Sequence, residues 1–334
     1  MHIHNVARAA IAALMVLLSC VGAATAFAQD AAKSTTAFPS RPVTFIVPQP
    51  TGGLSDLLAR VIGLKLADVW GQPVIVENRP GASGNIGAAL LSKAPPDGHT
   101  IMIAPAAIST AAALYKTPGF TVFETVQPVT LLGEVPFMLV VHPSLPVNTV
   151  AEFITYAKQN PDKLSLGSGG SGTVPHLSGE VLKMRAGIQF QHVPYKGGIQ
   201  AMTDLVAGHI QFTIDGGSHV VTQIDAKKVR MLAVATPQRL PQYPDTPTMA
   251  ESGYPGFEAS AWQMLFVTGG TPKPIVDKIQ ADVARILKTP EVAAVFEKAG
   301  IVPSGVSTVT TENFLRAEGV KWGNVIRVSG AKVD

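Results

Sequence analysis

Hydrophobic and polar positions along the chain predict short strands that alternate with amphipathic helices. Val43–Val47 is a β-branched run of strand length. From Ser55 or Asp56 to Trp70 the apolar side chains recur at helical spacing, and Gly71 ends the pattern. The first part of the chain thus predicts strands and helices in the order 43–47, 55–70, 74–77, 84–93 and 100–104. This β-α-β-α-β order predicts a parallel sheet with helices on both faces.

A second series of the same character follows, and the chain then ends in helices. Thr149 is the predicted N-cap of the first helix in this series. Strands are predicted over 164–166, 190–193, 210–214 and 230–235. Helices are predicted up to 159 and over 175–185, 199–207, 218–226, 273–288, 290–298 and 312–328.

Two longer strand-like runs, Pro136–His142 and Ala261–Thr268, lie between one series and the next. We interpret them as crossovers between two lobes. This interpretation assigns residues 38–140 and 262–334 to lobe one and residues 141–261 to lobe two. The predicted fold class is therefore α/β, with two lobes that each contain a mainly parallel sheet flanked by helices.

The composition excludes several other classes of protein. Of the 334 residues, 46% are hydrophobic and 15% are charged, which excludes a disordered chain. The formal net charge is +3 and no basic run is longer than Lys227-Lys228, so no nucleic-acid partner is expected.

Residues 1–28 have the pattern of a secretory signal peptide. Arg8 precedes the apolar run Ala9–Val21, and Ala26-Phe27-Ala28 fits the small-x-small cleavage rule. We therefore expect a periplasmic protein, cleaved after Ala28. The single cysteine, Cys20, follows Leu-Leu-Ser, so a lipoprotein anchored at Cys20 is the alternative.

Four glycine-rich loops are predicted between a strand and the helix that follows it. They span 48–56, 167–173, 194–198 and 214–218. Open α/β sheets bind ligands at such carboxyl ends of strands. Backbone N–H groups and helix N-termini favour a small anion such as a carboxylate. Because the loops come from both series, we expect the ligand to lie in a cleft between the lobes.

Each loop also has an interpretation without a ligand. The first can be a plain turn with Asp56 as the helix N-cap, and the second a flexible Gly/Ser turn. Tyr195 could donate its hydroxyl to a ligand, whereas Lys196 is more simply a solvated surface charge. Asp215 could receive a ligand ammonium group or could cap a helix.

Motifs for other chemistries are absent or incomplete in the sequence. Residues 167–172 match the dinucleotide-binding motif G-x-G-x-x-G, but 189–192 offer no acidic residue to bind the ribose of a dinucleotide. Residues 81–85 lack the last glycine of the hydrolase motif G-x-S-x-G. The histidines show no metal-ligand spacing. His176 and His192 lie near candidate loops, where a structural role is the simpler interpretation. We expect no cofactor, no metal and no enzymatic activity.

Several segments together resemble the Bug family, the extracytoplasmic substrate-binding proteins of tripartite tricarboxylate transporters. The longest is Val76–Ala88, and the others are 41–43, Gly52-Gly53-x-x-Asp56, 95–100, 192–198, 204–208 and 272–279. The resemblance implies a two-lobed periplasmic-binding-protein fold (type II, Venus-flytrap). It also implies a small organic carboxylate, aliphatic or aromatic, as ligand and integral-membrane permease subunits as partners. A monomer is expected.

The resemblance also implies roles for individual residues. Gly52 and Gly53 would hold one carboxylate through backbone groups, with Asp56 capping the helix. Thr51 stands where many members have proline, which is a departure from the family pattern. The other expected ligand-binding residues are Ala106, Ala107, Ser168, Gly169, Ser171, Gly172, Tyr195, Gly197 and, from the fourth loop, Asp215.

The predicted function is that of a receptor that captures a carboxylate between its lobes and delivers it to a membrane permease. A ligand-sensing adapter for a sensor kinase or chemoreceptor is an alternative that the sequence does not separate. An exported hydrolase or isomerase is a third possibility, and the missing catalytic motifs argue against it.

Overall fold

The computed structural model describes residues 38–114 and 117–329, so the expected signal peptide and Cys20 lie outside the described residues. The strands are β1 (Val43–Val47), β2 (Val74–Asn78), β3 (Thr100–Pro105), β4 (Val126–Val141), β5 (Ser165–Ser168), β6 (Gln191–Pro194), β7 (Phe212–Gly216), β8 (Arg230–Val234), β9 (Ser260–Thr268) and β10 (Val302–Pro303). The helices are α2 (Leu54–Trp70), the 3-10 turn η1 (Ala82–Gly84), α3 (Asn85–Leu91), α4 (Ala107–Leu114), α5 (Val150–Gln159), α6 (Val174–Ala186), α7 (Gly198–Val206), α8 (Ser218–Asp225), α9 (Lys273–Ile286), α10 (Pro290–Lys298) and α11 (Thr308–Ser329).

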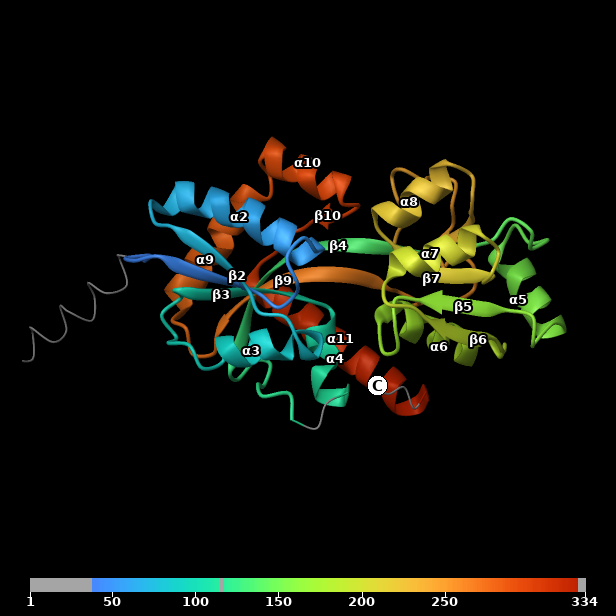
Figure 1. The fold of residues 1–334 in the computed structure, drawn as a ribbon, viewed down its shortest axis with the longest axis horizontal. Helices are drawn as coiled ribbons and strands as arrows, with labels where there is room; N and C mark the ends of the chain where they lie inside the picture. Colours follow the sequence, from blue (N-terminus) through green and yellow to red (C-terminus); the bar gives the residue numbers. More distant parts are fainter. Residues whose placement is uncertain (1–37, 115–116, 330–334) are drawn as a thin grey trace, which may run out of the picture.

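The molecule consists of two groups of elements joined by two long strands (Figure 1). We call the group with β1–β3, α2–α4 and α9–α11 the first lobe, and the group with α5–α8 and β5–β8 the second lobe. The strand order is β2-β1-β3-β9-β4-β7-β5-β6, with β8 and β10 also paired to β4. β1 is parallel to β2 and β3, and β5 is parallel to β6 and β7. The predicted α/β class with two lobes is confirmed.

Strand β4 belongs to both lobes. Its first part, up to Pro136, pairs antiparallel with β9, whereas Phe137 to Val141 pair with β7 and β8. The prediction placed the start of this strand at Pro136, which is wrong by ten residues, because β4 begins at Val126. Prolines and a glycine interrupt the strand pattern there, and the register shifts at Pro128/Thr130 and Leu131/Gly133 accommodate them.

Alternating side chains divide the core between the two faces of the sheet. In β3, Ile101 and Ile103 join the cluster beneath α2 and α9, while Met102 and Ala104 face α3, α4 and α11. The same alternation in β4 extends the cluster beneath α2 and α9 into the second lobe through Leu139. This period of two is what a sheet covered on both faces requires.

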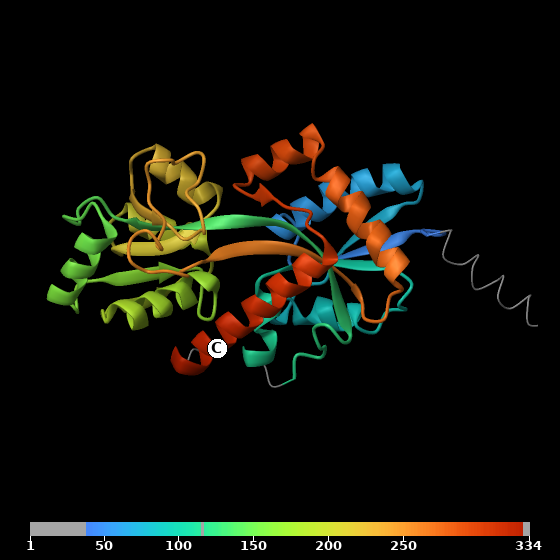
Figure 2. The same ribbon diagram turned by 180° about the vertical axis from the view of Figure 1, so that it is seen from behind.

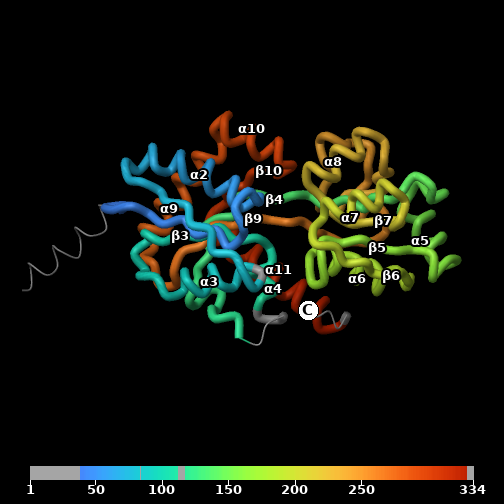
Figure 3. The backbone as a smooth tube through the Cα atoms, in the orientation of Figure 1, coloured from blue at the N-terminus to red at the C-terminus, as the bar shows by residue number. Residues whose placement is uncertain are grey.

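The C-terminal helices return to the first lobe, as the tube in Figure 3 also shows. Helix α9 packs on α2, and α11 packs on α4 and β4. Figure 2, the view from behind, shows α11 in red running from the first lobe toward the second, where it contacts α6. None of the helices in 38–114 and 117–329 is long and apolar enough to cross a membrane.

Two helix starts differ from the predictions. Ala106 and Ala107 were expected in a loop, but α4 begins at Ala107 directly after β3. The expected N-cap of the first helix was Ser55 or Asp56, whereas the cap is Gly53 and both of those side chains lie buried in the first turn. Both helices therefore begin closer to the preceding strand than the sequence predicted.

Candidate functional site

The candidate loops lie at the carboxyl ends of β1, β3, β5, β6 and β7, on the sides of the two lobes that face each other (Figures 1 and 3). Each loop leads directly into α2, α4, α6, α7 or α8. The N-caps of α2, α6, α7 and α8 are Gly53, Thr173, Gly197 and Gly217, and none of these residues caps its helix with a side-chain hydrogen bond. The first-turn N–H groups, together with the helix dipole, therefore remain able to bind an anion.

In the first lobe, Asp56 shapes the loop after β1. The Gly52 N–H donates to Asp56 Oδ2 at 2.9 Å, and Asn78 Nδ2 donates to Asp56 Oδ1 at 2.9 Å. Arg60 Nε also donates to Oδ2 at 3.1 Å. The hydrogen bonds from Arg60 and Gly52 lower the pKa of Asp56 to about 2, although burial opposes them. Since its two oxygens are already engaged, Asp56 positions Gly52 instead of capping the helix as predicted.

Two polar side chains tie this loop to the strands behind it. Ser55 Oγ lies 2.7 Å from Gln49 Oε1 and 2.8 Å from the Oε1 of the buried Gln263. Gln263 is on β9 and pairs with Pro105, the last residue of β3. Ala106 follows immediately and is buried. Through Gln263, the loop after β1 and the start of α4 are held next to each other.

In the second lobe, three of the four predicted loops come together. A Cβ on Gly169 would lie 3.1 Å from the Gly198 N atom, and one on Gly198 would lie 2.6 Å from Asp215 Oδ2. A side chain at either position would require a neighbouring group to shift. Asp215 was expected either to contact a ligand or to cap a helix; it lies in β7 and does not cap α8, and its Oδ1 accepts the Gly216 N–H at 2.8 Å. Its Oδ2 lies 3.4 Å from His219 Nε2, so the carboxylate has partners of its own.

Two stacked histidines hold the Ser/Gly loop of the second lobe. The rings of His176 and His192 lie parallel, with their centroids 3.9 Å apart. His192 Nε2 is 2.7 Å from Ser168 Oγ, and His176 Nδ1 accepts the Gly172 N–H at 3.0 Å. Burial lowers the pKa of His192 to about 4 and also lowers the pKa of His176. The structural interpretation of these histidines agrees with this geometry, and the Gly172 N–H is not free for a ligand.

Tyr195 is also engaged within the second lobe. Its hydroxyl donates to Asp204 Oδ2 at 2.7 Å. Burial, together with this hydrogen bond, raises the pKa of Tyr195 to about 12. The expected donation of the Tyr195 hydroxyl to a ligand is therefore replaced by a bond that anchors the loop to α7.

The candidate residues thus form one set in each lobe, and no hydrogen bond or ion pair in the described part of the chain joins the two sets. Thr51 is exposed and donates to Asn78 Oδ1 at 3.2 Å. Sequence reasoning missed the supporting side chains, namely Gln49, Ser55, Asn78, His219 and Gln263. Three hollows of the described structure, between α6 and α11, α8 and α10, and α4 and α11, are lined by none of the predicted site residues.

A two-lobed α/β fold with opposed strand-end loops defines the chain as a protein of the periplasmic-binding-protein class. Comparison with known proteins identifies the family. The model of the tripartite tricarboxylate transporter family receptor matches residues 58–331. The chain belongs to this family, and it is an extracytoplasmic solute-binding receptor rather than an enzyme.

Curated relatives match along nearly their whole length. Protein BugT of Bordetella pertussis is 33% identical over 320 residues, which cover 95% of this chain and 98% of BugT. A UPF0065 protein from the tcbD-tcbE intergenic region of Pseudomonas sp. strain P51 is 37% identical over 291 residues, or 87% of each chain.

Solved structures confirm the fold. R. palustris Rpa4515 with adipate is 36% identical, with a TM-score of 0.74 over 89% of this chain and 100% of that one. MatC from Rhodopseudomonas palustris with bound malate is 32% identical, with a TM-score of 0.70 over 86% of this chain and 100% of that one. A ligand-free TctC solute-binding protein from Polaromonas is 28% identical, with a TM-score of 0.79 over 87% of this chain and 99% of that one.

Proposed function

We propose that the protein binds a small dicarboxylate between its lobes and delivers it to the membrane permease of a tripartite transporter. The observation that carries this proposal is the convergence of uncapped helix N-termini, those of α2 in the first lobe and of α6, α7 and α8 in the second, on facing sides of the molecule. Two separate clusters of N–H donors suit a ligand with a carboxylate at each end. Relatives of known structure hold adipate and malate, which are such ligands.

We assign the direct contacts to backbone groups and short side chains. In the first lobe these are Gly53 and the start of α4, with Asp56 as a positioning residue that holds the Gly52 N–H. In the second lobe they are the N–H groups of Gly169 and Ser171 and the Ser171 hydroxyl, because the Gly172 N–H already donates to His176. Since Asp215 has its own partners, an ammonium group on the ligand is not required.

The proposal includes the export and the organisation of the chain. Residues 1–28 would be removed after Ala28, or Cys20 would carry a lipid. Residues 38–140 with 262–334 would move as one lobe and 141–261 as the other. The change of β4 partners between Pro136 and Phe137 supports boundaries close to these. The receptor would act as a monomer.

Isothermal titration calorimetry with adipate and malate tests the proposal, with adipamide as the uncharged control. A ligand at about 100 times its Kd should raise the free energy of unfolding by about 2.7 kcal/mol, which a thermal-shift assay detects independently. Binding of a diacid without binding of its diamide is the expected result. If no dicarboxylate binds to protein that has been unfolded and refolded to remove retained ligand, the assignment is wrong.

Two substitutions locate the site. Gly53→Val places a branched side chain at the start of α2, where a Cβ has room, and Ser171→Leu fills the second-lobe loop. Each should weaken diacid binding at least tenfold. Thr155→Leu is the matched control, because Thr155 is exposed on α5, within the second lobe but outside the candidate loops. Equal affinity in all four proteins would refute the site.

A further inference from the structure

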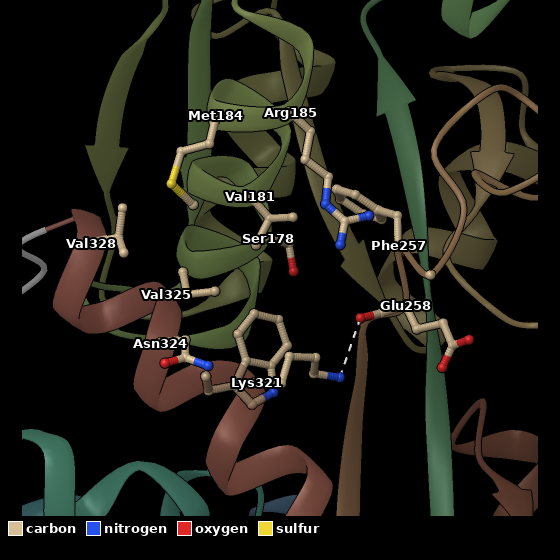
Figure 4. Close-up of a pocket in the computed structure, with 12 residues that line it drawn as sticks. Ser178, Val181, Met184, Arg185, Phe257, Glu258, Lys321, Asn324, Val325 and Val328 are labelled. Carbon is tan, nitrogen blue, oxygen red and sulfur yellow. Dashed lines mark hydrogen bonds between the residues drawn. The ribbon is translucent and has the colours of Figure 1, made fainter.

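A second hollow, unrelated to the candidate loops, lies between α6 of the second lobe and α11 of the first lobe (Figure 4). Its volume is about 310 Å³, near the lower end of the range for small-molecule sites. Ser178, Val181 and Arg185 line it from α6 at positions i, i+3 and i+7, which share one helix face. From α11, Lys321, Val325 and Val328 line it with a similar spacing.

One polar atom in this hollow has no partner. Ser178 is 1% exposed, and its Oγ makes no hydrogen bond within the described structure. Figure 4 shows the Oγ directed into the space between α6 and α11. A buried hydroxyl without a partner costs about 1 to 3 kcal/mol, so a helix residue in a well-packed core would ordinarily be apolar. An acceptor on a bound molecule would remove this cost.

The hollow has a cationic side and an apolar side. Arg185 is exposed, donates only to the Pro255 carbonyl at 2.9 Å, and forms no ion pair among the described residues. Lys321 lines the hollow from α11 and is paired with Glu318. The Glu258 side chain also lines the hollow, but its carboxylate points away from Ser178 in Figure 4. The net charge that faces Ser178 is therefore positive.

The apolar side is formed by valines and a methionine. Met184 and Val328 are 44% and 60% exposed, which is high for large apolar side chains. Val325, which also lines the hollow, is buried. A hydrocarbon chain that lay along this side would remove their apolar surface from water, at about 25 cal/mol per Å².

We propose that this hollow is a second binding site, for a small amphiphilic monocarboxylate. The carboxylate accepts hydrogen bonds from Ser178 Oγ and Arg185, and the aliphatic chain lies against Val181, Val325 and Val328. A dicarboxylate does not suit the site, because its second charge would be placed on the apolar side.

The test uses octanoate as the probe, with octanamide as the uncharged control, and calorimetry on the purified protein. Octanoate should bind and octanamide should bind at least tenfold more weakly. Ser178→Ala should weaken octanoate binding about tenfold, the effect of losing a hydrogen bond to a charged group. Arg185→Gln should weaken it to a similar extent, and Val181→Trp, which fills the hollow, should abolish it. Ser171→Leu should leave it unchanged.

Stability separates a ligand-binding role of Ser178 from a structural one. Ser178→Ala removes a hydroxyl that has no partner, so it should leave the midpoint of urea unfolding unchanged or raise it. Ser252→Ala is the matched control, because the Ser252 hydroxyl donates to the Thr248 carbonyl at 2.8 Å; it should lower the midpoint and leave octanoate binding intact. Absence of octanoate binding at millimolar concentration, equal affinity in Ser178→Ala, or a clear loss of stability in that variant would each overturn the proposal.

Discussion

The stacked histidines should make stability depend on pH, and substitution of His192 should reduce this dependence. His192 is packed against His176 and hydrogen-bonded to Ser168, and Lys183 adds a nearby positive charge. Burial is the largest cause of its lowered pKa, followed by His176 and Lys183. His176 faces Glu180 and Lys183 and has a lowered pKa as well. The fold therefore favours the neutral form of this pair.

The direction in which stability changes with pH follows from proton binding by the folded and unfolded chains. The pKa of His192 falls from 6.5 to about 4 on folding, so between these values the unfolded chain binds a proton that the native chain does not. The contribution of His192 to the free energy of unfolding is complete above pH 6.5 and is lost as the pH falls toward 4. At about 1.4 kcal/mol per pKa unit the upper limit is roughly 3 kcal/mol. Partial exposure of the ring reduces this to about 2 kcal/mol.

His192→Gln keeps a side chain that can hydrogen-bond to Ser168 but removes the proton-binding group. Urea unfolding of both proteins at a series of pH values from 7.5 to about 4.5 measures the effect. The wild-type protein should lose about 2 kcal/mol more than the variant over this range. His209→Gln, at a histidine whose side chain is 69% exposed, is the control and should retain the wild-type pH dependence. Parallel curves for wild type and His192→Gln would show that burial of the imidazole does not act as argued.

Three other substitutions test the local geometry by urea unfolding. Asp56→Asn should lower the free energy of unfolding at pH 7 by about 1 to 3 kcal/mol, because it weakens the hydrogen bonds from Gly52 and Arg60. This loss should shrink as the pH falls toward the wild-type pKa of about 2. Equal stability of the two proteins at pH 7 would contradict the prediction. Gly216→Ala should destabilise strongly, because its Cβ would lie 2.1 Å from the Pro136 carbonyl oxygen; a loss below about 1 kcal/mol would mean that β4 and β7 can separate freely. Gly323→Ala, in open space on α11, should stabilise by about 0.5 to 1 kcal/mol, and destabilisation would show that the added methyl group is not accommodated there.

The local elements of the fold were predictable where one signal dominates. β1 occupies the expected 43–47, and α5 begins after Thr149, whose Oγ1 accepts the Glu152 N–H at 3.2 Å. The first half of β4 was not predictable, because Pro128 and Gly133 argue against a strand. A Cβ on Gly133 would lie 2.6 Å from the Val302 carbonyl oxygen, so this glycine allows β10 to approach. The partner that explains the glycine lies 169 positions away, beyond the reach of any local pattern.

The candidate site likewise has a part that the sequence predicts and a part that it does not. The glycine-rich loops are visible in the sequence, because glycines after a strand predict backbone donors at a fixed place in the fold. The side chains that hold these loops are not visible, because they arrive from distant segments. Gln263 reaches Ser55 across 208 positions, and His192 reaches Ser168 across 24. Spacing alone assigned Asp56 to capping and left Asp215 between capping and a ligand contact, whereas hydrogen-bond partners in three dimensions determine what both carboxylates do.

The connection between the lobes explains how such loops can face each other without a direct bond between them. β4 and β9 form an antiparallel ladder with two register shifts up to the Pro136–Ser260 pair, and from Phe137 onward β4 pairs with Gly216 and its neighbours. Pro136 has no N–H, so the ladder loses no donor at the point where the strand changes partners. Away from β4, the lobes touch where α6 packs against α11, where a Cβ on Gly300 would lie 3.1 Å from Gly217, and where Val174 packs against the buried cluster beneath α3, α4 and α11. For the proposed receptor we expect bending at the point where β4 changes partners, with α6 and α11 shifting against each other, to bring the two half-sites onto one ligand.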